Sequence, residues 1–161
     1  MAVSIIICST SRYALWKRGR KVDDQSGDMI ESLLSSAGHR IMSRVLIPDG
    51  RRDLTNEIRK ATGSATVDSV IVCGGTGITK QDVTIEVIER LLDKEIPGFG
   101  EIFRKLSHDR IGSAAVLSRA LAGVIKSKAI FCLPGSTDAV RLAMNELILP
   151  EICHIVKHAS E

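Results

Sequence analysis

The sequence predicts an α/β fold, a three-layer sandwich in which a mainly parallel central sheet carries helices on both faces. Short apolar runs rich in Ile and Val recur along the 161 residues, and such runs are typical of strands buried on both faces. Segments with helical periodicity lie between most of these runs, and this alternation favours parallel strands. The last two runs are too close together for a helical connection, so one strand is expected to be antiparallel.

Five apolar runs are interpreted as strands: Val3–Cys8, Ile41–Ile47, Ser69–Cys73, Gly123–Ile125 and Ala129–Leu133. The apolar fraction of 44% is enough for an ordinary core, and no linker or internal repeat interrupts the chain. A single domain over residues 1–161 is therefore expected.

Four segments have the apolar periodicity of helices. The first two helices are each expected to begin at an N-capping Ser or Asp and to end at a Gly. The last helix is expected to end at a Pro. The expected limits are Ser26 to Gly38, Asp53 to Gly63, a start near Asp82, and an end at Pro150.

The strand Ser69–Cys73 runs into the glycine-rich segment 74–77, and a helix is expected to follow. Glycines accept positive φ and let a ligand approach the backbone, while a helix N-terminus offers unpaired N–H groups. This combination favours phosphate. The segment is not a Walker A loop, because Lys80 is not followed by Ser or Thr. Nor is it a dinucleotide fingerprint, because Lys80 occupies the position of the third glycine.

A second glycine-containing loop, Pro134-Gly135-Ser136, also leads from a strand into a helix. It could bind a second phosphate or a carbonyl-rich ring. The alternative is that Pro134 and Gly135 only turn the chain while Ser136 caps the helix. In a parallel sheet both loops emerge at the carboxyl edge, where ligands bind.

Two carboxylates follow strands at this same edge. Asp82 is either an N-cap or a ligand of Mg²⁺ that carries phosphate oxygens, and Asp49 is either a turn residue or the second ligand. Mg²⁺ is usually held by one or two carboxylates together with substrate oxygens.

The segment Ser9–Gly27 contains the only Tyr and the only Trp of the chain, Tyr13 and Trp16, among several Lys and Arg residues. The aromatic rings could pack over a flat heterocycle, or the segment could be a solvated basic lid at the end of the sheet.

Several classes of protein are disfavoured by composition. A net charge of +3 is too slight to indicate a nucleic-acid partner, and no apolar run approaches the roughly 20 residues that span a bilayer. We expect a cytoplasmic protein with no membrane partner, in which Cys8, Cys73 and Cys132 are buried and reduced. The spacing of Cys153, His154 and His158 matches no common zinc pattern.

Six short motifs are spread over nearly the whole chain: Asp24-Gln25-Ser26-Gly27, Ile47-Pro48-Asp49, Gly74-Gly75-Thr76-Gly77 with Asp82, Pro97-Gly98-Phe99-Gly100-Glu101, Leu117-Ser118-Arg119 and Leu133-Pro134-Gly135-Ser136. In these motifs, and in their order and spacing, the chain resembles the MogA/MoaB family of molybdenum cofactor biosynthesis. One departure is Ser9-Thr10-Ser11-Arg12, where many family members have an acidic residue after the serine.

The resemblance implies a MogA-like molybdopterin-binding fold and an adenylyltransferase that uses ATP and Mg²⁺ to convert molybdopterin to adenylyl-molybdopterin and pyrophosphate. It implies that Asp49 and Asp82 are the catalytic carboxylates and the Mg²⁺ ligands. The implied nucleotide-binding residues are Ser11, Ser26, Gly27, Gly74, Gly75, Thr76 and Gly77, and the implied molybdopterin-binding residues are Ser107, Pro134, Gly135 and Ser136.

The resemblance also implies a homo-oligomer, either a trimer or a hexamer, and a MoeA-like metal-insertion protein as a further partner. Two other functions remain open. One is a non-catalytic binding protein for molybdopterin or a precursor, because some MoaB-type members lack the activity. The weaker one is a nucleotide pyrophosphate hydrolase, which the CinA-like relatives of the domain suggest.

Overall fold

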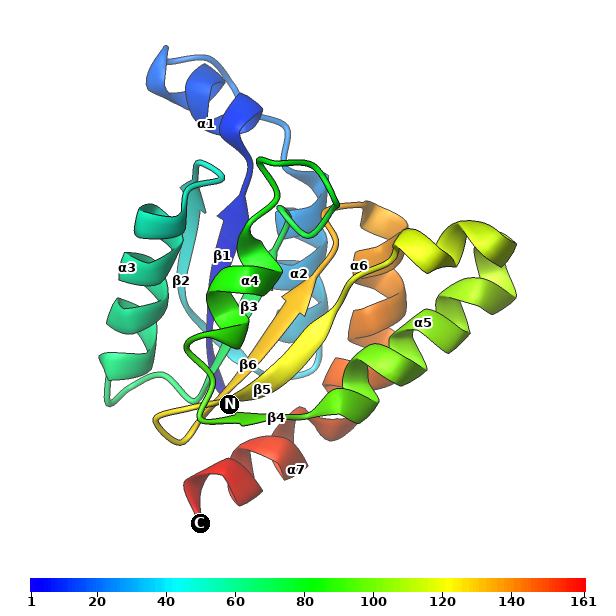
Figure 1. Cartoon of the computed structure of the whole chain (residues 1–161). Coiled ribbons are helices and arrows are strands. Elements are labelled where there is room, and N and C mark those ends of the chain that lie inside the picture. The colour runs from blue at the N-terminus through cyan, green and yellow to red at the C-terminus, as the bar shows by residue number, and fades with distance from the viewer.

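A computed structural model describes all residues, 1–161, and contains one six-stranded sheet of order β2-β1-β3-β6-β5-β4 (Figure 1). β1, β2, β3 and β6 are parallel, whereas β5 runs antiparallel to both of its neighbours. The mainly parallel sheet with one antiparallel strand is thus confirmed. The strands are β1 (Ala2–Cys8), β2 (Arg40–Ile47), β3 (Ser69–Cys73), β4 (Lys94–Glu95), β5 (Leu121–Ile125) and β6 (Lys128–Leu133).

Helices connect these strands and cover the sheet. They are α1 (Thr10–Lys17), α2 (Gln25–Ser36), α3 (Arg51–Gly63), α4 (Thr84–Glu89), α5 (Pro97–Ile111), α6 (Thr137–Ala143) and α7 (Leu149–Ser160). A 3₁₀ helix, Gly112–Leu117, follows α5, and a π-helical turn, Met144–Ile148, joins α6 to α7. None of the helices is both long and apolar enough to cross a membrane.

The core consists of two apolar clusters on opposite faces of the sheet, because neighbouring strand residues point to opposite sides. Ile5, Ile71 and Phe131 pack with α2, α5, α6 and α7 on one face. Ile6 and Val72 pack with α3 and α4 on the other face. This arrangement is the expected three-layer sandwich.

Two expected N-caps are wrong, whereas the helix expected to start near Asp82 does start close to it. Asp24, not Ser26, caps α2, because its side chain accepts the backbone N–H of Gly27. Gly50 precedes α3, so Asp53 lies in the first helical turn, where its charge suits the helix dipole. The next helix, α4, begins at Thr84, which leaves Asp82 in the preceding loop.

The expected helix end at Pro150 is also wrong. A π-helical turn precedes Pro150, and its wider hydrogen-bond pattern replaces the regular α-helical turn that a proline would break. The chain therefore stays helical from Thr137 to Ser160.

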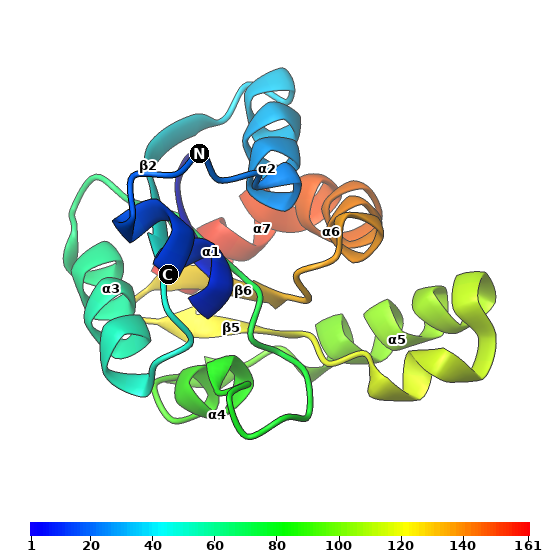
Figure 2. The same ribbon diagram turned by 90° about the horizontal axis from the view of Figure 1, so that it is seen from above.

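The helix α5 was not predicted from the sequence. This helix and the following 3₁₀ helix project from the body of the molecule as an arm (Figure 2). Its first turns are anchored by the buried rings of Phe99 and Phe103. Gly100 allows the close approach, because a Cβ there would lie 2.7 Å from the carbonyl oxygen of Ala120.

Candidate functional site

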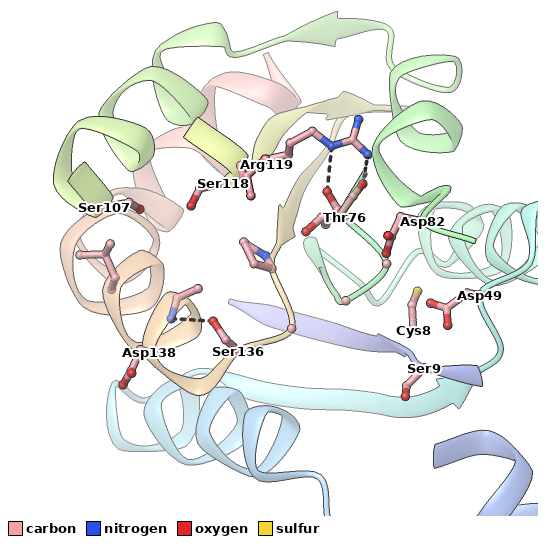
Figure 3. Close-up of a pocket in the computed structure, with 18 of the residues that line it drawn as sticks. Cys8, Ser9, Asp49, Thr76, Asp82, Ser107, Ser118, Arg119, Ser136 and Asp138 are labelled. Carbon is pink, nitrogen blue, oxygen red and sulfur yellow. Dashed lines mark hydrogen bonds between the residues drawn. The ribbon is translucent and has the colours of Figure 1, made fainter. Parts of the chain in front are cut away.

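A cavity of about 660 Å³ lies where the carboxyl ends of the parallel strands meet. The chain leaves β1 toward β2 on one side and returns to β3 on the other, and such a topological switch point is the usual ligand site of an open α/β sheet. Asp49, Cys8 and Asp82 line one side of the cavity, and Ser107, Ser136 and Asp138 line the other (Figure 3).

The glycine loop, residues 74–77, forms the wall of the cavity beyond β3. Gly74 and Gly75 have φ values of +101° and +64°, which other residues rarely adopt. A Cβ on Gly74 would collide with the carbonyl oxygen of Cys8. A Cβ on Gly75 would lie 2.5 Å from Oγ1 of Thr84 and 2.9 Å from Oδ1 of Asp49. The loop therefore requires glycine for both its conformation and its packing.

All four carbonyl oxygens of the glycine loop are already hydrogen-bonded by the protein. Thr84 donates its Oγ1–H to Gly74 O at 2.8 Å and its backbone N–H to Gly75 O at 3.0 Å. Arg119 donates through Nε to Thr76 O at 2.8 Å and through Nη2 to Gly77 O at 2.6 Å.

Two N–H groups of the loop, unlike its carbonyl oxygens, have no hydrogen-bond partner in the protein. No hydrogen bond links the backbone N–H of Gly75 or Thr76 to an acceptor in the chain. Successive free N–H groups in such a turn make an anion-binding concavity. The expected role of the following helix is wrong, however, because α4 begins seven residues after Gly77. The donors belong to the loop itself.

Glu86 anchors the guanidinium group that holds the loop. Nη1 of Arg119 donates to Oε1 of Glu86 at 2.7 Å. This hydrogen bond lowers the pKa of Glu86, although partial burial acts in the opposite direction. Oε2 of Glu86 is buried and has no hydrogen-bond partner.

Asp82 lies in the loop between Gly77 and α4, and its Oδ2 accepts the backbone N–H of Thr79 at 2.9 Å and its hydroxyl at 2.7 Å. Burial raises the pKa of Asp82, but hydrogen bonds from Thr79 and Gly77 and the charge of Arg119 outweigh this effect and lower it. The carboxylate is therefore held in its charged form. Its position excludes the N-cap role considered above.

Asp49 follows β2 and is oriented by Thr10, at the start of α1. Oδ2 of Asp49 accepts the backbone N–H of Thr10 at 2.7 Å and its hydroxyl at 2.8 Å, and Thr10 Oγ1 in turn accepts the backbone N–H of Asp49 at 2.9 Å. Oδ1 takes part in none of these bonds. It is the oxygen that faces Gly75.

The cavity has the donors for a hard cation but not a complete protein cage. No group of three or more His, Cys, Asp or Glu side chains converges there. Asp49 and Asp82 are the carboxylates that flank the glycine loop, and Oδ1 of Asp49 is free to bind. Two carboxylates with substrate phosphates and water are the usual ligands of Mg²⁺, so this donor set fits that ion.

The second loop, Pro134-Gly135-Ser136, lines the cavity beyond β6. Ser136 is the N-cap of α6, since its Oγ accepts the backbone N–H of Ala139 at 3.3 Å, so the simpler of the two interpretations holds for its hydroxyl. A Cβ on Gly135 would lie 3.4 Å from Cα of Gly74. The two glycine-containing loops are therefore in contact and form one continuous wall.

Two of the predicted nucleotide-binding residues do not line the cavity. Ser26 is buried and donates its hydroxyl to Gly135 O at 2.7 Å, so it supports the second loop from behind. Gly27 packs against Asp24 and Arg44. Ser11 does line the cavity.

The far side of the cavity is built by the arm. Ser107 lines it but donates its hydroxyl to Phe103 O within α5. Arg110, Ile111 and Leu117 line it as well and were not predicted. On the side of the cavity away from the glycine loop, Arg110 supplies a cation, and Ile111 and Leu117 supply apolar surface.

The segment Ser9–Gly27 contains the helix α1 rather than a loop alone. Arg12 lines the cavity and pairs with Asp24 at 3.1 Å. Tyr13 and Trp16 pack on each other with ring centroids 5.7 Å apart, and neither lines the cavity. Trp16 is 59% exposed. The aromatic lid stays a prediction.

Three thiols are buried and free, as expected: Cys8, Cys73 and Cys132. Cys8 lines the cavity, but burial raises its pKa to about 12, so it is a neutral thiol at physiological pH. A cysteine nucleophile is not part of this site.

Asp49 and Asp82 were predicted from the sequence and do line the cavity, but the residues that position Asp49 and the glycine loop were not predicted. Thr10, Thr84 and Arg119 act across sequence separations of 10 to 43 residues. The motif Leu117-Ser118-Arg119 marked one of them without indicating its partners. The hydroxyl run Ser9-Thr10-Ser11 was the only local signal for Thr10.

Residues 4–154 match the family model described as "Probable molybdopterin binding domain". The chain is 50% identical over 133 residues to the Bacillus cereus protein named "Molybdenum cofactor biosynthesis protein B", an alignment that covers 82% of this chain and 79% of the relative. It is 37% identical over 158 residues to a Methanocaldococcus jannaschii protein named "Probable molybdopterin adenylyltransferase", with 98% and 93% covered.

Solved structures agree with the sequence relatives. A crystal structure of a molybdenum cofactor biosynthesis protein B superposes with a TM-score of 0.89 at 42% identity, covering 99% of this chain and 95% of the other. The tungsten cofactor synthesizing protein MoaB from Pyrococcus furiosus superposes with a TM-score of 0.87 at 36% identity, covering 99% and 97%.

Proposed function

Because the chain belongs to the MogA/MoaB family, whose shared domain is described as a probable molybdopterin-binding domain, we propose that it acts in molybdenum cofactor biosynthesis as a molybdopterin adenylyltransferase. ATP and molybdopterin are its substrates, and adenylyl-molybdopterin and pyrophosphate are its products. The Methanocaldococcus jannaschii relative, with the adenylyltransferase name, supports the reaction.

One observation carries the proposal. The glycine loop has all four of its carbonyl oxygens hydrogen-bonded by Thr84 and Arg119, while N–H groups of Gly75 and Thr76 stay free beside two charged carboxylates. Free N–H donors favour phosphate oxygens, and the carboxylates would repel phosphate unless a cation lay between them. That combination supports a metal-bound polyphosphate.

The reaction needs positioning more than a protein nucleophile. The terminal phosphate of molybdopterin attacks the α-phosphorus of ATP, a new P–O bond forms, and the bond from the α-phosphorus to the bridging oxygen breaks as pyrophosphate leaves. The N–H groups of the glycine loop and the guanidinium of Arg12 would stabilise the charge that builds on the phosphates.

Asp49 and Asp82 are the residues that would hold Mg²⁺. The bound ion would neutralise the polyphosphate and stabilise the departing pyrophosphate. The protein contributes orientation, because Thr10 and Thr79 each fix one oxygen of the respective carboxylate. The low pKa of Asp82 keeps it ionised for this role.

The opposite side of the cavity suits the second substrate. Ser136 and Gly135 lie beside the glycine loop, and Arg110, Ile111 and Leu117 face it from the arm. A pterin needs flat apolar contacts and hydrogen bonds, and its terminal phosphate needs a cation nearby. The contact between Gly74 and Gly135 would bring the two reacting phosphates together.

The test is to incubate the protein with ATP, Mg²⁺ and molybdopterin and to measure adenylyl-molybdopterin by mass spectrometry. Product above a control without enzyme is expected. Molybdopterin binding without product would instead indicate the non-catalytic binding protein. Pyrophosphate bond hydrolysis in the absence of molybdopterin would indicate the hydrolase, for which a CinA structure at 18% identity supports only the fold.

A further inference from the structure

A histidine pair near the C-terminus lies outside the cavity described above. His154 and His158 are one helical turn apart on α7, with ring centroids separated by 4.6 Å. Their Nε2 atoms are 2.8 Å apart. Both side chains are solvent-accessible and line a separate hollow between α7 and β4, which shares no residue with the glycine-loop cavity. Figure 1 shows this end of α7 beside β4, away from α1.

The other ring nitrogens of the pair each face a carboxylate. Nδ1 of His154 lies 3.3 Å from Oε2 of Glu151, and Nδ1 of His158 lies 3.2 Å from Oε2 of Glu161. An ionised carboxylate only accepts hydrogen bonds, so the proton of each neutral imidazole belongs on Nδ1. Both Nε2 atoms then present lone pairs to each other across 2.8 Å. Two lone pairs at this separation require an electropositive centre between them or beside them.

That centre is either a shared proton or a metal ion, and the geometry suits a metal. Metal–imidazole bonds of 2.0–2.1 Å to two nitrogens 2.8 Å apart enclose an angle of about 86°, close to the cis angle of square-planar or octahedral coordination. Carboxylates on the Nδ1–H groups are the usual outer partners of metal-bound histidines, since they fix the tautomer and raise ligand basicity.

The ligand type defines the ion. Two imidazoles favour late first-row metals over Mg²⁺, which prefers oxygen. No third His, Cys, Asp or Glu side chain converges with the pair, so water would fill the remaining positions. The sequence spacing alone did not indicate this, because it lacks the four ligands of a structural zinc site.

We propose that His154 and His158 form a two-histidine chelate for one divalent late first-row metal ion, of the Ni²⁺, Cu²⁺ or Zn²⁺ class, with Glu151 and Glu161 as positioning residues. This site is separate from the proposed Mg²⁺ and nucleotide site. The result of its test therefore does not depend on whether the protein is an adenylyltransferase.

The test is calorimetric titration of the tag-free full chain with Ni²⁺ in a non-coordinating buffer. One Ni²⁺ per chain is expected at this site. Loss of an outer partner of a metal-bound histidine already costs about ten- to hundredfold in affinity, so His154→Gln and His158→Gln should each weaken binding at least about tenfold. The exposed His108 supplies a matched control, and His108→Gln should leave the affinity unchanged, as should Cys153→Ser.

Electron paramagnetic resonance with Cu²⁺ gives a second readout. Wild type should show coupling to two imidazole nitrogens, and each variant to one. Absence of Ni²⁺ binding by the wild type would overturn the proposal and leave the shared proton as the bridge. The proposal would also be overturned if Ni²⁺ affinity fell by less than about tenfold in His154→Gln or His158→Gln, or if it fell equally in His108→Gln. Circular dichroism establishes that the variants keep their helices.

Discussion

Arg119, which lines the cavity, forms an ion pair with Glu86 at 2.7 Å beside the glycine loop. The same guanidinium group holds the carbonyl oxygens of Thr76 and Gly77. Because Arg119 occupies these carbonyl oxygens, the polar backbone groups of the loop that stay free are the N–H groups of Gly75 and Thr76. Arg119 is thus a positioning residue for the loop, and Glu86 is its anchor.

Arg119→Lys should weaken ATP binding, because an ammonium group cannot hold two carbonyls and Glu86 in the fork geometry of a guanidinium. Each hydrogen bond to a charged group contributes about 1.5–3 kcal/mol to stability, so the loosening of the loop by the loss of one should weaken ATP affinity by up to about tenfold. Equilibrium binding of a slowly hydrolysed ATP analogue measures the effect. The exposed Arg90 offers a control, and Arg90→Lys should bind like the wild type. Unchanged affinity in Arg119→Lys would contradict the positioning role.

Glu86→Gln should destabilise the protein in a pH-dependent way. The folded state lowers the pKa of Glu86 below its ordinary value of 4.5, so its contribution is fully present above that value and is lost as pH falls through the folded pKa. Urea unfolding of the wild type and the variant should therefore show the largest difference near neutral pH. That difference should shrink below about pH 4.5. A difference that stays constant over this range would argue against the charged pair.

Gly75→Ala should disrupt the loop. A left-handed conformation costs a residue with a Cβ roughly 1–2 kcal/mol, and the methyl group would also press against Thr84 and Asp49. Gly63→Ala is the matched control, because a Cβ there meets nothing within 4 Å. The melting temperature and the ATP affinity should both be lower for Gly75→Ala, and both should be unchanged for Gly63→Ala. Similar behaviour of the two variants would show that the loop does not need glycine at this position.

Thiol labelling checks the burial of the cysteines. The thiolate is the reactive form, and burial raises the pKa of Cys8 and Cys73 to about 12 and that of Cys132 well above its usual range. A disulfide reagent at about pH 8 should label only the exposed Cys153 in the native protein, and all four cysteines in urea. Rapid labelling of Cys8 in the native protein would contradict its burial and would show that reagents reach it through the cavity.

Much of the fold could be predicted from the sequence, because buried strands carry their own signal. The run Ser69–Cys73 is apolar on both faces and bounded by polar and glycine residues, and β3 has these limits. Since the carboxyl ends of parallel strands share one edge, the positions of Asp49 and Asp82 at that edge followed from the predicted parallel strands.

Other features depend on contacts that no local pattern encodes. Arg119 lies 42 and 43 residues from the carbonyls that it holds. The helix α5 was missed because Gly98 and Gly100 lower helical propensity, whereas tertiary packing of Phe99 and Phe103 stabilises it. Pro150 was misjudged because the π-helical turn before it could not be anticipated.

We propose that Asp82 serves the nucleotide half of a two-substrate site, and Asp82→Asn removes the charge on which this role depends. The measurement compares the rate of adenylyl-molybdopterin formation with molybdopterin affinity in the wild type, in Asp82→Asn and in the control Asp53→Asn, whose carboxylate lies outside the cavity. Asp82→Asn should lose at least about a hundredfold in rate and keep its molybdopterin affinity, while Asp53→Asn should match the wild type. Equal rates for Asp82→Asn and the wild type would contradict this role of Asp82.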